Sequence, residues 1–88
     1  MGKKNKKTKE NISNLPSKDG NYNLFNRKEE IVYTGQGNIK DRISAHSNDP
    51  DMPFTSYSYN LEPSARKRNE IEEKRIKRYK PPLNKQKK

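Results

Sequence analysis

Two tyrosines stand close together in the chain, in the short triplets Gly20-Asn21-Tyr22 and Tyr33-Thr34-Gly35. Each lies in a short apolar run, and residues 26–30 between the runs are polar and few enough for a hairpin loop. Because side chains alternate along a strand, antiparallel pairing of the runs can place both phenols on one sheet surface. A phenol, with an ordinary pKa of about 10, is a base near neutral pH only where nearby cations favour the phenolate. Taken alone, the same residues are also typical of strands in a small core.

The predicted element that follows the second tyrosine carries two side chains that can be positively charged. A helix is predicted over residues 38–47, with Asn38 as its N-cap, and Arg42 and His46 lie one turn apart on it. Arginine presents a planar fork of donors that matches a phosphate oxygen, and it stays charged at any relevant pH. Histidine can relay a proton or bind phosphate. Both residues are also common on solvated helix surfaces, so their spacing alone leaves the two interpretations open.

The rest of the chain supplies the elements that must position these groups. Alternating apolar residues predict strands, and caps with helical periodicity predict helices. The glycines of Gly35-Gln36-Gly37 should end the second strand, Ser64 should cap the last helix, and Lys80-Pro81-Pro82 should stop it. We expect an α+β domain with a small three-stranded antiparallel sheet over residues 20–26, 30–35 and 54–60, flanked by helices over 38–47 and 64–79.

Charge is distributed unevenly along the 88 residues. Residues 1–14 hold five lysines and one glutamate, and residues 85–88 hold three lysines, so +4 and +3 of the formal net charge of +10 lie there. We expect residues 1–14 to be a disordered basic arm, residues 15–84 a folded domain and residues 85–88 a basic tail. Such tails can bind nucleic-acid phosphates or another polyanion, or remain solvated extensions.

Composition also argues against several kinds of site. The chain has no cysteine and one histidine, and it has no glycine-rich loop ending in Gly-Lys-Ser or Gly-Lys-Thr. Disulfides, thiolate metal sites, Ser/His/Asp catalysis and P-loop chemistry are therefore set aside. No apolar run is long enough for a membrane span or a signal-peptide core, so we expect a soluble, cytoplasmic protein without a membrane partner.

With these elements placed, residues 15–84 resemble the GIY-YIG endonuclease domain. Gly20-Asn21-Tyr22 matches the first triplet of that family, with Asn21 in place of an aliphatic residue. Tyr33-Thr34-Gly35 matches the second, with Thr34 where isoleucine or valine is usual. The ordered set continues with Arg42, His46, Glu72 on the last helix, Pro81-Pro82 and Asn84.

The resemblance implies a metal-dependent endonuclease that hydrolyses DNA phosphodiester bonds. Glu72 would hold one Mg²⁺ or Mn²⁺ ion, and Arg42 would clamp a phosphate oxygen. Tyr33 is favoured as the base that activates water, with Tyr22 orienting water or phosphate, although the residues do not decide between the two phenols. The site residues implied are Tyr22, Tyr33, Arg42, His46 and Glu72, while Gly35 belongs to the second triplet and Asn84 ties the terminal loop by hydrogen bonds.

The chain departs from the family pattern at two further positions. Gln36 stands where some members carry lysine, and Arg75 stands where an apolar residue is usual.

The expected partner is DNA, held by its phosphate backbone largely independently of sequence, with a partner protein or fused specificity domain absent from this chain. Two alternatives stay open: an inactive GIY-YIG-like module that binds nucleic acid, or a basic ribosome- or nucleoid-associated protein whose motif matches are accidental.

Overall fold

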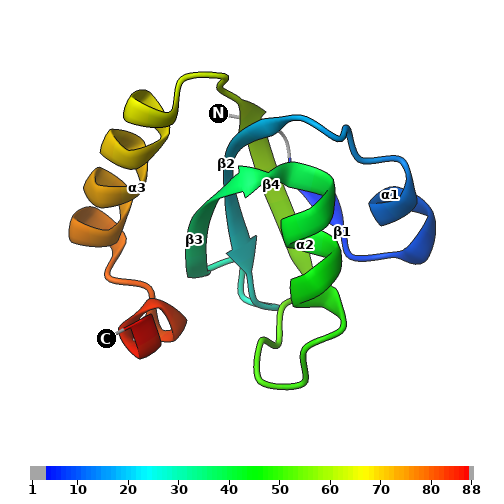
Figure 1. The fold of residues 1–88 in the computed structure, drawn as a ribbon. Coiled ribbons are helices and arrows are strands. Elements are labelled where there is room, and N and C mark those ends of the chain that lie inside the picture. Colours follow the sequence, from blue (N-terminus) through cyan, green and yellow to red (C-terminus); the bar gives the residue numbers. More distant parts are fainter. Residues whose placement is uncertain (1–3, 88) are drawn as a thin grey trace.

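The computed structural model describes residues 4–87 and contains one four-stranded antiparallel sheet with helices on both faces (Figure 1). The strand order is β1-β4-β2-β3. Helix α3 lies on one side of the sheet, and α1 and α2 lie on the other (Figure 1). The elements are β1 Asn5–Lys6, α1 Lys9–Ser13, β2 Asp19–Phe25, β3 Ile31–Asn38, α2 Ile39–Ser47, β4 Ser56–Leu61, α3 Ala65–Tyr79 and the 3-10 helix η1 Pro82–Lys87. The α+β class is confirmed.

Strands β2 and β3 form the predicted hairpin. The Asn26 side chain organises its loop, because its Oδ1 accepts hydrogen bonds from the backbone N–H of Lys28 at 2.9 Å and of Glu30 at 3.0 Å. Glu29 completes the turn with a left-handed φ of 64°. In the resulting register Leu24 faces Tyr33 and Tyr22 faces Gly35, so the side chains of Tyr22 and Tyr33 share one face of the sheet.

The expected end of the second strand is wrong, because β3 continues to Asn38 through both glycines. Gly37 pairs with Gly20 and Gly35 pairs with Tyr22, so ladder hydrogen bonds hold a stretch that intrinsic preference would leave irregular. Gly20 also allows β2 to approach β4 closely, since a Cβ there would lie 2.1 Å from the carbonyl oxygen of Asn60. Glycine is therefore needed at position 20 because β2 and β4 lie too close together there for a side chain.

The predicted helix caps are present. The Asn38 side chain accepts from the backbone N–H of Asp41 at 3.1 Å, and the Ser64 side chain accepts from that of Lys67 at 3.3 Å. Helix α3 ends at Tyr79, because Lys80 takes a left-handed conformation with φ of 46° before the prolines. No helix among residues 4–87 is long and apolar enough to cross a membrane.

The amino-terminal segment differs from the disordered arm expected over residues 1–14. Residues 4–14 include β1, which pairs with the outer edge of β4, and α1, which begins at the N-cap Thr8. The Lys4 ammonium lies 4.6 Å from the ring centre of Phe25, and Lys7 lies 4.5 Å from that of Phe54. Lysine stems and cations thus cover apolar edges of the core, which their charge alone does not predict. The three-stranded sheet therefore gains a short fourth strand.

The structure describes only part of the predicted basic arm and of the predicted basic tail. Residues 1–3 of the predicted arm and residue 88 of the predicted tail lie outside the described residues. Residues 85–87 of the tail continue η1.

The two faces of the sheet differ in chemistry. On the α2 side lies the apolar core, with Ile39 and Ile43 fully buried against it. On the α3 side, Asn21, Asn23 and Thr34 are buried, and none of the 15 residues of α3 is fully buried. The core residues are Leu15, Tyr22, Leu24, Val32, Tyr33, Ile39, Ile43, Phe54 and Tyr57.

Candidate active site

Tyr22 of β2 and Tyr33 of β3 lie side by side at the β3 edge of the sheet. Their rings stack with centroids 6.2 Å apart and planes 26° apart, and both side chains are buried. Gly35 makes room for this pair. A Cβ at position 35 would lie 2.5 Å from the Tyr22 hydroxyl oxygen and 3.0 Å from the Tyr33 ring, so any side chain there would displace a phenol.

Helix α2 brings Arg42 and His46 to the same phenols. The Tyr22 hydroxyl lies 2.8 Å from His46 Nε2, and the His46 ring centre lies 4.9 Å from that of Tyr33. The Arg42 side chain is exposed to solvent while its guanidinium neighbours both phenol oxygens. Tyr22 is the main cause that raises the pKa of Arg42, burial opposes it, and the guanidinium stays charged at any relevant pH.

The electrostatics of this cluster assign its protons. Burial is the main cause that raises the pKa of the Tyr22 phenol well above its ordinary value, and neighbouring Tyr33 and Glu72 raise it further while Arg42 lowers it. Burial, and then Arg42, lower the pKa of His46. Near neutral pH Tyr22 therefore keeps its proton and His46 is neutral, and a hydrogen bond joins the Tyr22 hydroxyl to His46 Nε2.

Helix α3 brings Glu72 to this edge from the opposite face of the sheet. Its Oε1 lies 3.4 Å from Nε2 of Gln36, the residue that follows Gly35 on β3. The carboxylate is close enough for its charge to contribute to the raised pKa of Tyr22. Glu72 is half-buried, whereas its neighbour Glu73 is exposed.

The donor set at Glu72 limits which ion would fit. Among residues 4–87 there is no cluster of three or more His, Cys, Asp or Glu side chains. Such a site does not suit Zn²⁺, which takes three or four protein ligands. A hydrated Mg²⁺ or Mn²⁺ fits better, because hard cations accept one carboxylate and complete their coordination with water and substrate oxygens.

Asn84 has a backbone role. Its Oδ1 accepts from the N–H of Thr34 at 2.9 Å, and its Nδ2 donates to the carbonyl of Thr34 at 3.0 Å. The amide is buried and ties η1 to the outer edge of β3, next to Tyr33. Asn84 thus lies apart from the cluster that Tyr22, Tyr33, Arg42 and His46 form, while Glu72 approaches that cluster from α3.

Sequence reasoning missed the residues that connect Glu72 to the sheet. Arg68 Nε donates to Gln36 Oε1 at 3.0 Å, and Gln36 Nε2 donates to Asn69. Arg68 precedes Glu72 by one helical turn, so the i, i+4 spacing already placed both on one side of α3. The basic composition of the helix concealed this, since Arg68 resembled one more solvated cation.

Comparison with known proteins gives a match at the level of structure. No family model and no curated protein matches the chain. Three solved structures of the GIY-YIG N-terminal endonuclease domain of UvrC from Thermotoga maritima match it, each a point mutant bound to the catalytic divalent cation. Their TM-scores are 0.71, 0.71 and 0.70, at 17%, 20% and 18% identity, and each match covers 83% of this chain and 89% of that chain. The chain therefore has the fold of the GIY-YIG endonuclease domain, as its sequence motifs predicted.

Proposed function

We propose that this protein is a metal-dependent endonuclease that hydrolyses phosphodiester bonds of DNA. The observation that carries the proposal is the convergence of side chains from β2, β3, α2 and α3 around Gly35. Two phenols, a guanidinium, a neutral imidazole and a carboxylate meet there, and the UvrC domains of the same fold hold a catalytic divalent cation.

Each side chain of the cluster has a role that its environment supports. Arg42, exposed and charged, binds a non-bridging oxygen of the scissile phosphate with its planar fork. Tyr22 keeps its proton and is hydrogen-bonded to His46, so it serves as a fixed hydrogen-bonding group rather than a base. Tyr33 is then assigned the role of base: after its own hydroxyl proton has passed to solvent, its phenolate oxygen, beside Arg42, accepts a proton from the attacking water. His46, one turn from Arg42, is available to bind phosphate or to relay a proton.

Glu72 would hold one divalent ion, Mg²⁺ or Mn²⁺, on the carboxylate that α3 presents beside Gln36. Such an ion supplies Lewis-acid stabilisation of the leaving oxygen. The protein's own contribution is to fix the carboxylate opposite the phenols, so that phosphate and water meet between two opposed sets of groups.

The exposed cations of α3 support a nucleic-acid substrate. Lys74, Lys77 and Arg78 lie exposed on the helix that carries Glu72, where they can contact phosphates without reading bases. Binding through such contacts weakens steeply with salt and depends little on sequence. We therefore propose that the DNA substrate is held by its phosphate backbone.

The decisive experiment is incubation of the full chain with supercoiled plasmid, with and without Mg²⁺ or Mn²⁺. The parent is expected to relax or linearise the plasmid only when a metal is added. Glu72→Ala should abolish cleavage while DNA binding persists, because the carboxylate acts mainly in the transition state. Glu73→Ala, which removes the same charge from the next, exposed residue, is the matched control and should cut like the parent.

A second variant tests the phosphate clamp. Arg42→Ala should lower the rate by about 10²-fold, in the range found for the loss of one oxyanion donor. Arg42→Lys keeps the charge without the planar fork and should recover only part of that loss. If the parent does not cut the plasmid with either metal, the nuclease proposal is overturned and an inactive nucleic-acid-binding module takes its place. If the parent cuts and Glu72→Ala cuts as fast, the role assigned to the Glu72 carboxylate is wrong.

A further inference from the structure

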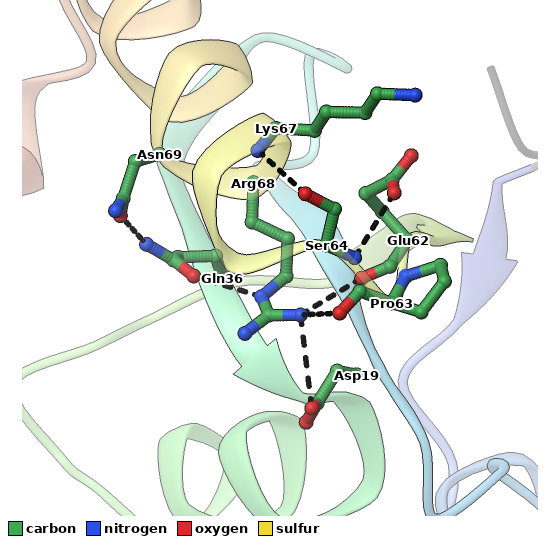
Figure 2. A network of polar contacts seen from close by, with 8 residues as sticks. All are labelled: Asp19, Gln36, Glu62, Pro63, Ser64, Lys67, Arg68 and Asn69. Carbon is green, nitrogen blue, oxygen red and sulfur yellow. Dashed lines mark hydrogen bonds and ion pairs between the residues drawn. The ribbon is translucent and has the colours of Figure 1, made fainter.

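The polar contacts around Arg68 connect four separate parts of the chain. Its Nη1 donates to the carbonyl oxygens of Glu62 at 2.9 Å and Pro63 at 3.0 Å, in the segment between β4 and α3. The same nitrogen lies 3.7 Å from the Asp19 carboxylate at the start of β2. Its Nε donates to Gln36 of β3 at 3.0 Å. Figure 2 shows the guanidinium in the middle of this network, with Gln36 on one side and the two carbonyls on the other.

Arg68 determines which way the Gln36 amide points. A guanidinium carries donors and no acceptor, so the group of Gln36 that faces it must be the carbonyl oxygen Oε1. The NH₂ group of Gln36 therefore points away from the Arg68 guanidinium and toward other side chains of α3. It donates there to Asn69 Oδ1 and lies 3.4 Å from Glu72 Oε1 (Figure 2 shows the contact to Asn69). A flipped Gln36 amide would set two donors against each other at Arg68 and two acceptors against each other at Glu72.

From this arrangement we propose that Gln36 is a positioning residue for Glu72 and that Arg68 sets the orientation of Gln36. The inference rests on the proposed function, in which Glu72 holds a divalent cation. Gln36 presents an N–H to one carboxylate oxygen and restricts how the Glu72 side chain can turn on its helix. Because the donor is neutral, it fixes the carboxylate without cancelling the charge that attracts the metal.

Burial and anchoring make Arg68 suitable for this purpose. Its side chain is 12% exposed, far less than that of Arg66 on the same turn, which is 89% exposed and paired only loosely with Glu70 at 3.7 Å. The contacts to two loop carbonyls hold the guanidinium in one place, so its Nε–H reaches Gln36 from a fixed point. Lysine at position 68 would keep the charge and lose this two-sided geometry.

The experiment measures metal binding directly, by the loss of the free Mn²⁺ signal in electron paramagnetic resonance, with the full chain and no DNA. Gln36→Met preserves side-chain length and removes both the acceptor for Arg68 and the donor to Glu72. It is expected to weaken Mn²⁺ binding by about 10-fold, as for other outer-sphere partners of metal ligands. On supercoiled plasmid, kcat should fall while KM stays within about twofold, because the basic surface is unchanged.

Arg68→Lys provides the second variant, with Arg66→Lys as its matched control. Arg68→Lys should weaken Mn²⁺ binding in the same direction, since the Gln36 amide loses its fixed partner, and Arg66→Lys should leave both binding and cleavage unchanged. If both Gln36→Met and Arg68→Lys bind Mn²⁺ within twofold of the parent while Glu72→Ala does not, the positioning role is overturned and the proposed function stands. If Glu72→Ala also leaves Mn²⁺ binding intact, both the proposed function and the positioning role of Gln36 are overturned.

Discussion

The two faces of the sheet hold their helices by different means. Against α2 the sheet presents aromatic and aliphatic side chains, and Ile39 and Ile43 are fully buried among them. Against α3 it presents Asn21, Asn23 and Thr34. Thr34 donates to Asn23 within the sheet, and Asn21 donates to the backbone of α3. One helix is attached by removal of apolar surface from water, and the other by directional hydrogen bonds.

The contacts on the α3 side are specific but individually weak. Arg75 crosses this interface, with Nη2 donating to Asn60 at 3.1 Å and Nη1 to Asn23 at 3.4 Å. Asn21 donates to the carbonyl of Arg68 at 3.1 Å, while its buried Oδ1 has no hydrogen-bond partner among the described residues. Each such bond contributes only about 0.5–1.5 kcal/mol net, and a buried group without a partner costs more. The α2 side therefore carries the stability, and the α3 side carries the placement of Glu72.

The largest expected effect comes from truncating the apolar side. Ile43→Ala removes a fully buried side chain and should lower the free energy of unfolding by about 2–5 kcal/mol in urea denaturation. Ile71→Ala, on the half-buried face of α3, is the matched truncation and should cost less than about 1.5 kcal/mol. Equal losses for the two variants would contradict the distinction between the faces.

Native-state hydrogen exchange should show the same difference without a substitution. Few apolar contacts hold α3, so its amides are expected to exchange through a local opening that α2 does not share. We expect protection factors in the middle of α3 to be about 10-fold lower than in α2, a difference of about 1.4 kcal/mol. Protection equal in both helices would mean that they unfold as one unit.

A smaller effect is expected at Arg75. Burial lowers the pKa of its guanidinium, which means that desolvation works against its charge at this position. Arg75→Leu replaces buried polar contacts by apolar packing and should change the free energy of unfolding by less than about 1 kcal/mol in either direction. A loss of several kcal/mol would show that the polar interface is itself a main source of stability.

The smallest expected effect is a pH dependence of the free energy of unfolding. It comes from His46 on α2, which is the only histidine of the sequence. Its pKa is lowered in the folded protein, mainly by burial, so the unfolded chain takes up a proton first as the pH falls. Stability from neutral His46 is then complete above about pH 6.5 and is lost as the pH falls through the lower folded pKa. His46→Gln can still accept from Tyr22 without titrating, and its stability should vary less between pH 7 and 5. If the free energy of unfolding of the parent and of His46→Gln changed equally between pH 7 and 5, this prediction would be contradicted.

Much of the architecture could be predicted from local sequence signals. Alternation and the spacing of the tyrosines placed β2, β3 and β4, and Asn38 and Ser64 marked the helix starts correctly. These features depend on neighbours a few residues apart, which single-sequence patterns describe well. The shared face of Tyr22 and Tyr33 followed from the two-residue period of strands.

What could not be predicted depends on partners far away in the sequence. Strand β1 forms because Asn5 and Lys6 meet β4 some fifty residues later, although their composition is that of a solvated tail. The orientation of Gln36 depends on Arg68, 32 residues away, and nothing local distinguishes Arg68 from the other cations of its helix. Interactions that a residue type permits but does not require become visible only in three dimensions.

The Asn84 amide has a consequence for how this protein meets other chains. Strand β3 is an edge strand, and an uncovered edge presents backbone donors and acceptors to any extended peptide that approaches. At Thr34 both groups are already engaged by the two ends of one side chain, which copies the hydrogen-bonding pattern of a neighbouring strand. Asn84 thus occupies the backbone groups that an added strand would need at Thr34, next to Tyr33.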